Sequence, residues 1–377
     1  MKKCIVISDS FKGTLSSVEI CAIAKESIPR FFPECEVDAI PVADGGEGTV
    51  ACFVSALGAE LVETTVSGPY FEKVRASYAR IGSRAVIETA AAAGLPLVGE
   101  RRNPAATTTY GVGELIRHAR THGCGEIFLG IGGSATNDGG CGCAAALGVR
   151  FLDREGRAFV PTGECLSRIA SIDCGEAERL LGGARITVMC DVTNPLHGEH
   201  GAAFVFGPQK GADPDMVRML DGELRAFGRV LREGLGRDVS ALPGAGAAGG
   251  MGGGMAALFG AELRSGIEAI LDMVDFDRRL LGADLVITGE GRVDGQSMQG
   301  KVLSGVAGRT KRAGVPLVVI AGGIGDGAEA AYEMGVTAMF GIDRPAVAFE
   351  DYGAESGRHY QAVLEDVLRL GKAAGKW

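Results

Sequence analysis

The chain has 377 residues, of which 60 are glycine, and its formal net charge at pH 7 is −9. The length allows two domains with sizeable cores, and the acidic balance argues against a nucleic-acid or anionic membrane partner. The apolar run that begins the chain ends at Asp9, too early for a signal peptide, and no apolar span is long enough for a membrane helix. Several of the ten cysteines lie in or beside apolar runs, which predicts free thiols in a cytoplasmic protein.

The first sixty residues alternate short apolar strands with helical patterns. Ser16 and Glu19 form a capping-box pattern, which predicts a helix start. We expect strands at 5–7 and 37–42, and helices from Ser16 to about Arg30 and at 49–57.

The middle of the chain has a different texture. Residues 59–89 alternate with period two between turn signals, which predicts an antiparallel meander. Asp213 and Pro214 have the pattern of an N-cap and a first helical residue. The helix that they begin is expected to bury a stripe made of Met216, Met219, Leu220, Leu224, Phe227 and Leu231. Residues 241–261 are either a linker or, because they carry large apolar side chains, a close-packed segment.

The last hundred residues again alternate short apolar strands with helical patterns, as the first sixty do. Strands are expected at 285–288, 317–321 and 338–342, and helices at about 301–312, 328–334 and 356–373. Strands that alternate with helices indicate a doubly wound parallel sheet. The chain is therefore expected to be α/β, with one discontinuous domain at 1–62 plus 283–377 and an inserted mixed α/β domain at 63–282.

A glycine-rich segment at 130–140 follows a strand-like run and precedes a small-residue helix. Glycines let backbone N–H groups approach a ligand, and a helix N-terminus favours an anion. The candidate phosphate-binding residues are Gly132, Gly133, Ser134, Thr136, Asn137 and Asp138. The alternative is a tight strand-to-helix turn whose glycines serve packing alone.

Polar residues follow the two strands expected near the N-terminus, where open α/β sheets bind ligands. Lys12, beside Ser10, could bind a phosphate or carboxylate, or it could be a solvated loop lysine. The second strand leads into Asp44, Gly45, Gly46 and Glu47. These two carboxylates suit a metal, a general base or a substrate hydroxyl, and a helix-capping turn is the alternative.

Further candidates follow later strands. Asp191 directly follows an apolar run, where it could hold Mg²⁺ or accept a hydroxyl proton, although an Asx-turn explains it equally well. Asn194 and the glycine-flanked Lys210 come after it. Glu290, Arg292 and Asp294 follow the strand at 285–288.

Two common nucleotide motifs occur in incomplete form. Residues 295–301 have P-loop spacing, but Val302 stands where Ser or Thr should ligate Mg²⁺. Residues 130–135 match the dinucleotide fingerprint G-x-G-x-x-A, with Asp153 about twenty residues on. The required βαβ unit is not evident, because a short strand at best follows Gly148.

Taken together, seven ordered segments closely resemble the bacterial glycerate kinase family of the glyoxylate and galactarate pathways. They lie at 9–15, 41–49, 130–140, 191–196, 204–212, 244–250 and 287–294. Cys141 and Cys143 depart from the small residues usual in that family. The resemblance implies ATP-dependent phosphorylation of D-glycerate, usually at the 2-hydroxyl. It also implies a flavodoxin-like domain with an inserted domain likened to restriction endonucleases.

The resemblance suggests roles for the candidates. ATP phosphates would lie against 132–137, and Asp191 or Asp294 would hold Mg²⁺. Asp191, or else Asp44, would accept the hydroxyl proton, and Lys12, Lys210 or Arg292 would neutralise negative charge. Neither nucleic acid nor membrane is an expected partner, and a homodimer is left open. The alternatives are an NAD(P)-dependent oxidoreductase of a small hydroxy acid and a regulatory sugar-acid sensor.

Overall fold

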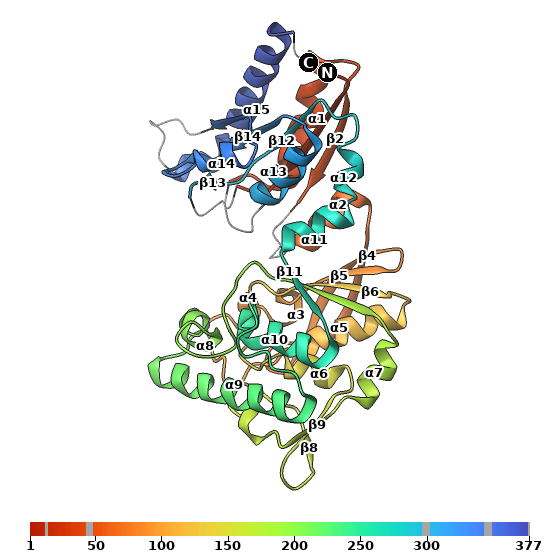
Figure 1. Cartoon of the computed structure of the whole chain (residues 1–377), viewed down its shortest axis with the longest axis vertical. Helices are drawn as coiled ribbons and strands as arrows, with labels where there is room; N and C mark the ends of the chain where they lie inside the picture. The colour runs from red at the N-terminus through yellow and green to blue at the C-terminus, as the bar shows by residue number, and fades with distance from the viewer. Residues whose placement is uncertain (12–13, 43–47, 296–301, 343–348, 376–377) are drawn as a thin grey trace. The chain divides into compact units, whose positions relative to one another are not determined.

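A computed structural model describes residues 1–11, 14–42, 48–295, 302–342 and 349–375 (Figure 1). The chain divides into two compact units. Unit 1 comprises Met1–Asp44, Ala51–Gly58 and Gly266–Trp377, and unit 2 comprises Gly45–Val50 and Ala59–Ser265. Apart from the short segment Gly45–Val50, the structure separates the units at 58 and 265, where the sequence placed the boundaries near 62 and 282.

Unit 1 contains a five-stranded sheet in the order β16-β14-β12-β1-β2, and all neighbouring strands are parallel. Its strands are β1 (Lys3–Ser8), β2 (Glu36–Pro41), β12 (Leu285–Thr288), β14 (Leu317–Ala321) and β16 (Ala338–Gly341). Strand order reverses between β1 and β12, the point beyond whose carboxyl ends open α/β sheets bind ligands. Two short parallel strands, β13 (Arg292–Val293) and β15 (Gly323–Ile324), lie outside this sheet.

The helices of unit 1 are α1 (Ser17–Phe31), α2 (Thr49–Leu57, whose first two residues fall in unit 2), α11 (Gly266–Met273), α12 (Phe276–Arg279), α13 (Val302–Ala313), α14 (Ala330–Glu333) and α15 (Phe349–Ala373). The capping box begins α1 as expected, since Ser16 Oγ accepts from Glu19 N and the Glu19 carboxylate accepts from Ser16 N. The unit boundary falls before α11 because α11 packs on α13, where Gly305 lies against Ile267.

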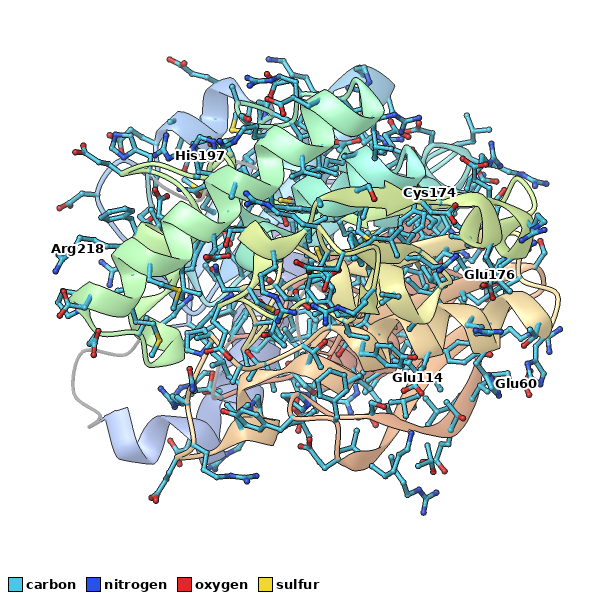
Figure 2. The ribbon with its side chains drawn as sticks, turned by 90° about the horizontal axis from the view of Figure 1, so that it is seen from below. Glu60, Glu114, Cys174, Glu176, His197 and Arg218 are labelled. Carbon is cyan, nitrogen blue, oxygen red and sulfur yellow. The ribbon has the colours of Figure 1, made fainter. Side chains whose placement is uncertain are left out.

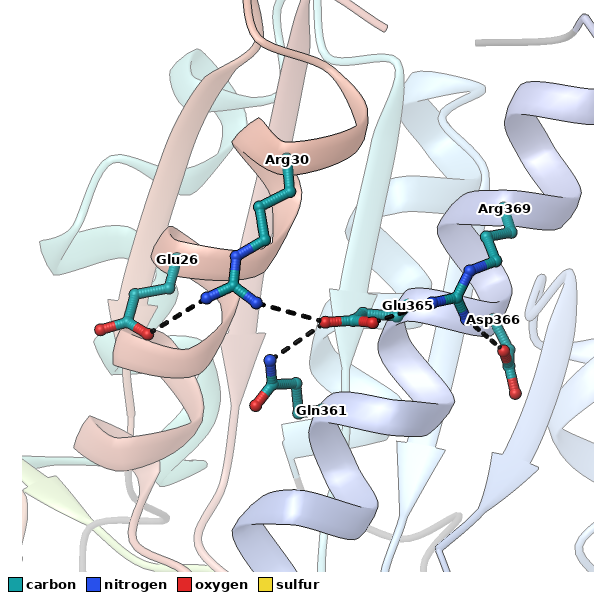
Figure 3. A network of polar contacts seen from close by, with 6 residues as sticks. All are labelled: Glu26, Arg30, Gln361, Glu365, Asp366 and Arg369. Atoms are coloured by element: carbon teal, nitrogen blue, oxygen red, sulfur yellow. Dashed lines mark hydrogen bonds and ion pairs between the residues drawn. The ribbon is translucent and has the colours of Figure 1, made fainter.

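Helices α1 and α15 lie side by side over one face of the unit 1 sheet (Figure 1). Ile20 of α1 and Leu364 of α15 are fully buried in the same core cluster as Val6. A polar network joins the solvent sides of the two helices through Glu26, Arg30, Gln361, Glu365, Asp366 and Arg369 (Figure 3). Exposed pairs of this kind add little stability, so the apolar cluster holds the helices in place.

Unit 2 contains a six-stranded mixed sheet in the order β11-β10-β6-β5-β4-β3. The strands are β3 (Glu60–Ser67), β4 (Lys73–Ile81), β5 (Arg84–Glu88), β6 (Glu126–Gly130), β10 (Arg185–Met189) and β11 (Glu262–Arg264). The first three form the expected antiparallel meander, and β5, β6, β10 and β11 run parallel. A separate antiparallel sheet contains β7 (Arg150–Leu152), β8 (Ala158–Phe159) and β9 (Ser171–Asp173).

The helices of unit 2 are α3 (Ala90–Ala93), α4 (Leu95–Val98), α5 (Tyr110–Thr121), α6 (Cys141–Ala146), α7 (Gly175–Leu181), α8 (Ala202–Phe206), α9 (Pro214–Leu235) and α10 (Ala247–Phe259). As expected, Asp213 caps α9 by accepting from Met216 N at 2.8 Å. The predicted apolar stripe is buried at four of its six positions, but Met219 is exposed and the prediction for it was wrong. Arg218 of α9 and Glu60 of β3 point outward (Figure 2). No described helix is long and apolar enough to cross a membrane.

Candidate active site

One edge of the unit 2 sheet gathers four strand ends. The parallel strands β5, β6, β10 and β11 are neighbours, so their carboxyl ends share that edge. Glu88 ends β5, Gly130 ends β6, and Asp191 and Ser265 come shortly after β10 and β11. The sheet topology thus brings the glycine-rich segment and Asp191 to the same edge.

The glycine-rich loop begins as a backbone-paired segment. Leu95 N donates to Gly133 O at 3.0 Å, and Ala135 N donates to Ala93 O at 2.8 Å. Gly133 has φ +69°, a conformation that glycine adopts without strain. Gly132 and Gly133 are exposed, and their N–H groups donate to no other described residue. These two amides are available to an anion.

Asp138 fixes the second half of the loop. It is fully buried, and its carboxylate accepts from Thr109 N, Thr109 Oγ1, Gly140 N and Gly142 N at 2.8–3.2 Å. Burial raises the pKa of this carboxyl group, and the four donors oppose that shift. Since its oxygens are occupied within the protein, Asp138 shapes the loop, although the sequence suggested that it binds a ligand.

Lys210 ties the loop to the short 3₁₀ helix Pro208–Lys210. Its Nζ donates to Ser134 Oγ at 2.9 Å and to Thr136 O at 2.7 Å. Burial lowers the pKa of Lys210 to about 7, against the opposing effect of the Asp138 carboxylate. A neutral amine has two N–H donors, so either protonation state can satisfy both acceptors.

Asn137 and Thr136 carry polar atoms that the protein leaves unsatisfied. Both side chains are fully buried, yet Asn137 Oδ1, Asn137 Nδ2 and Thr136 Oγ1 have no hydrogen-bond partner among the described residues. Such groups cost free energy unless a ligand or water completes them. The two residues are therefore strong candidates for ligand contacts.

The glycine motif at 244–250 supports the loop from behind. Ala248, Gly249 and Gly250 have φ of +52°, +68° and +91°, which kink the start of α10. Gly249 O accepts from Gly139 N at 3.0 Å. A Cβ on Gly249 would lie 2.5 Å from Asn137 Cα. The segment at 241–261 is thus close-packed, which excludes the linker interpretation.

The Asp191 side chain is exposed at its strand end, and its Oδ1 accepts from Ser265 Oγ at 2.9 Å. Asn194 has a local role instead. Its side-chain Nδ2 donates to His200 O at 2.8 Å, and its backbone carbonyl oxygen accepts from Gly246 N at 2.9 Å. Asn194 therefore joins its loop to the 244–250 motif.

In unit 1, the candidates Ser10 and Glu290 follow the adjacent strands β1 and β12. Ser10 N donates to Asp9 Oδ1 at 2.7 Å, and Asp9 N donates to Gly289 O at 2.9 Å. Glu290 is only 5 % exposed. The two loops are thus joined at the switch point of this sheet.

Arg292 and Asp294 pair with each other, with Arg292 Nε 3.5 Å from Asp294 Oδ2. Among the described residues, no three His, Cys, Asp or Glu side chains form a metal-binding group. The remaining candidates lie outside the described residues: Lys12, Asp44, Gly45, Gly46 and Glu47.

Sequence reasoning missed several residues that shape the site. Thr109 bonds Asp138, Ser265 bonds Asp191, and Glu88 accepts from Val50 N at 2.7 Å. Glu88 lies in the segment 59–89 predicted as a meander, and the structure places it at the end of β5. Nothing local distinguished Thr109 or Ser265, because their partners are 29 and 74 residues away.

The fold that a dinucleotide fingerprint requires does not surround residues 130–135. After the loop the chain enters β7, which belongs to the separate antiparallel sheet rather than to the sheet of β6. Asp153 accepts from Arg157 N at 2.9 Å within a turn. The βαβ unit that this fingerprint requires is therefore not formed.

The parallel strand ends, the glycine-rich loop and its unsatisfied amide define an α/β enzyme with a site suited to an anion. The whole-chain comparisons agree with one such class. A family model described as "Glycerate kinase family" matches residues 4–372 of the chain. A glycerate kinase of Bacillus cereus is 42 % identical over 99 % of both chains, and a glycerate 2-kinase of Escherichia coli is 43 % identical over 90 % of both. A crystal structure assigned to glycerate kinase 2 of Salmonella typhimurium LT2 has a TM-score of 0.90 at 40 % identity, covering 100 % of this chain and 99 % of that one.

The chain belongs to the glycerate kinase family. It is a kinase, and the NAD(P)-dependent oxidoreductase alternative has no support.

Proposed function

We propose that this protein transfers the γ-phosphoryl group of ATP to the 2-hydroxyl group of D-glycerate. The observation that carries the proposal is the buried, unsatisfied Asn137 amide in a glycine-rich loop of a glycerate kinase family chain. The E. coli relative named glycerate 2-kinase supports the 2-hydroxyl as acceptor over the 3-hydroxyl.

The loop suits the phosphates of ATP. Phosphoryl transfer depends on positioning and charge stabilisation more than on covalent chemistry. The exposed N–H groups of Gly132 and Gly133 would donate to phosphate oxygens, and the Asn137 amide and Thr136 hydroxyl would complete the contacts. Asp138 and Lys210 would hold the loop in shape.

Asp191 is the proposed general base, because its carboxylate is exposed at the same sheet edge. The Ser265 hydroxyl would orient it through the bond to Oδ1. Asp44 is the second choice. Lys12, Arg292, Ser10 and Glu290 remain proposed substrate-binding residues, together with Gly45, Gly46 and Glu47.

The described residues fit Mg²⁺ only modestly. Mg²⁺ commonly uses one or two protein carboxylates and otherwise binds water and substrate phosphates, so the absence of a larger cluster among the described residues does not conflict with it. Either Asp191, in place of its role as base, or Asp294 would hold the ion; Asp191 Oδ1 accepts from Ser265 Oγ, and Asp294 pairs with Arg292. When bound, the ion would neutralise charge on the phosphates.

We also infer that unit 1 is flavodoxin-like, since its parallel strands follow the order 2-1-3-4-5 when counted along unit 1. Unit 2 would correspond to the inserted domain likened to restriction endonucleases. A homodimer remains a hypothesis. Size-exclusion chromatography with light scattering would test it by giving the mass of the protein in solution.

Activity and regiochemistry can be tested together by ³¹P and ¹³C NMR of a reaction with ATP, Mg²⁺ and D-glycerate. We expect phosphorus coupling to C1 and C3 as well as to C2, a pattern that only a phosphate on the C2 oxygen gives. A phosphorylated C3 would contradict the regiochemistry, and ATP consumption independent of glycerate would contradict the function.

The role of Asp191 predicts that Asp191→Asn lowers kcat by about 10² or more without changing the melting temperature. Asp173→Asn, at an exposed strand end of another sheet, is the matched control and should keep normal turnover. Near-normal turnover of Asp191→Asn would remove the assignment.

A further inference from the structure

Two adjoining hollows open beside the segment that pairs with the glycine-rich loop. One, of about 340 Å³, is lined by Tyr70 and residues 100–103. The other, of about 590 Å³, is lined by Leu95, Pro96, Gly99, Glu100 and Arg102. They share Glu100 and Arg102, and both are shallow and open to solvent.

The walls of these hollows are bonded to the loop on two sides. Leu95, which lines the larger hollow, donates from its N–H to Gly133 O. Arg102 Nη1 donates to Gln209 O at 3.2 Å, and the next residue is Lys210, which reaches Ser134 and Thr136. The hollows and the proposed phosphate site therefore belong to one bonded framework within unit 2.

The lining combines three kinds of chemistry. Leu95 and Pro96 are apolar, Tyr70 carries a ring with Arg101 5.4 Å from its centroid, and Glu100 is a carboxylate beside Arg102. A bare phosphate would be repelled by Glu100. A nucleoside instead offers a flat base for the ring and apolar surfaces, and amino and hydroxyl donors for the carboxylate.

We propose that these hollows bind the adenosine part of ATP, with Tyr70 and Leu95 contacting the base. The proposal rests on the proposed function, because it places the nucleoside next to the loop that would hold the phosphates. Arg102 lines both hollows and bonds Gln209, the residue before the loop-binding Lys210. Its guanidinium therefore suits the phosphate end of the nucleotide.

The turn that presents Tyr70 keeps an unfavourable conformation. Phe71 has φ +65° and a 45 % exposed side chain, a position where glycine is the usual residue. Its N–H donates to Gly68 O, and the Tyr70 hydroxyl donates to Arg101 O. A left-handed conformation at a residue other than glycine costs roughly 1–2 kcal/mol.

The test uses calorimetric titration of the full chain with ADP and with inorganic tripolyphosphate. Tyr70→Ala should raise the Kd for ADP at least tenfold and leave that for tripolyphosphate within twofold. Tyr70→Phe keeps the ring and should retain ADP affinity within about threefold. Phe159→Ala is the matched control, because Phe159 also carries an arginine over its ring, that of Arg168 at 4.7 Å.

Unchanged ADP affinity in Tyr70→Ala would overturn the proposal, and so would an equal loss for ADP and tripolyphosphate, which would indicate a phosphate site or a general loop defect. The titration needs no turnover. A wild-type protein that fails to phosphorylate D-glycerate would therefore refute the proposed function alone, while the ADP result would still decide the nucleoside site.

Discussion

Replacing Gly249 by alanine tests the support behind the glycine-rich loop. The residue has φ +68°, and its Cα faces the backbone of Thr136 and Asn137. An added Cβ would lie 2.5 Å from Asn137 Cα and still closer to Thr136 O, so that backbone must move. Neither neighbour is the flexible end of a side chain, and the strain cannot relax through a rotamer change.

Two costs add in this variant. An alanine in the left-handed region costs roughly 1 kcal/mol, and forcing a methyl group into close-packed backbone costs roughly 1–3 kcal/mol more. A loss of about 3 kcal/mol in the free energy of unfolding corresponds to a melting temperature roughly 6–12 °C lower for a domain of this size. Displacing Asn137 by about 1 Å should lower kcat on the order of 10²-fold.

Calorimetric melting and ATP-coupled turnover measure both effects. Gly222→Ala is the control, because Gly222 lies inside α9 and a Cβ there meets nothing within 4 Å. It should stabilise the protein by roughly 0.5–1 kcal/mol at unchanged kcat. If Gly249→Ala melts and turns over like the wild type, the close approach of α10 to the loop is wrong.

Three further changes test the loop and unit 1. Asn137→Ala should lower kcat/KM at least tenfold with little loss of stability, because its amide has no partner among the described residues; unfolding by urea together with steady-state kinetics would show this, and a stability loss without a kinetic effect would contradict it. Lys210 has a pKa lowered to about 7 in the folded protein, so above pH 7 the unfolded chain retains this proton and the folded chain loses it. The free energy of unfolding of the wild type should therefore rise with pH. Relative to that of Lys210→Met, it should increase by roughly 1–2 kcal/mol from pH 7 to 8.5. An equal pH dependence of the two proteins would exclude a buried amine with a lowered pKa. Arg309→Ala removes a 9 % exposed guanidinium that bonds Glu268, Asp272 and Asp277 at 2.5–2.7 Å. Urea unfolding should show a free energy of unfolding that is lower by about 2–3 kcal/mol. A decrease below about 0.5 kcal/mol would mean that solvent satisfies these carboxylates.

Local signals in the sequence predicted most strands and helices. The Ser16 capping box, the Asp213 cap and the period-two alternation of 59–89 each depend on residues only a few positions apart, and the structure confirms all three. The strand at 285–288 and the helix at 49–57 have the predicted bounds. Helical period alone misplaced Met219, because it does not fix how wide a face of α9 is covered.

The roles within the site could not be predicted in the same way. Asp138 and Lys210 have side chains that would suit a ligand, and only the fold shows that they bond the loop itself. Lys210 and Ser134 are 76 residues apart, and Gly249 approaches Asn137 from still further along the chain. Such contacts depend on packing between elements, so local pattern carries no information about them.

The abundance of glycine in this chain is compatible with a rigid site because the loop is held by side chains rather than by its own conformational preference. Glycine loses more freedom on folding than other residues, and the loop therefore needs compensating bonds. Asp138 supplies acceptors to four donors, Lys210 supplies donors to two acceptors, and Gly249 closes the back by direct contact. Polar capacity that remains after this internal bonding, at Asn137 and Thr136, is what the loop can offer to a phosphate. Disrupting any of the three supports should therefore lower turnover even though, in the proposed arrangement, none of them touches the substrate.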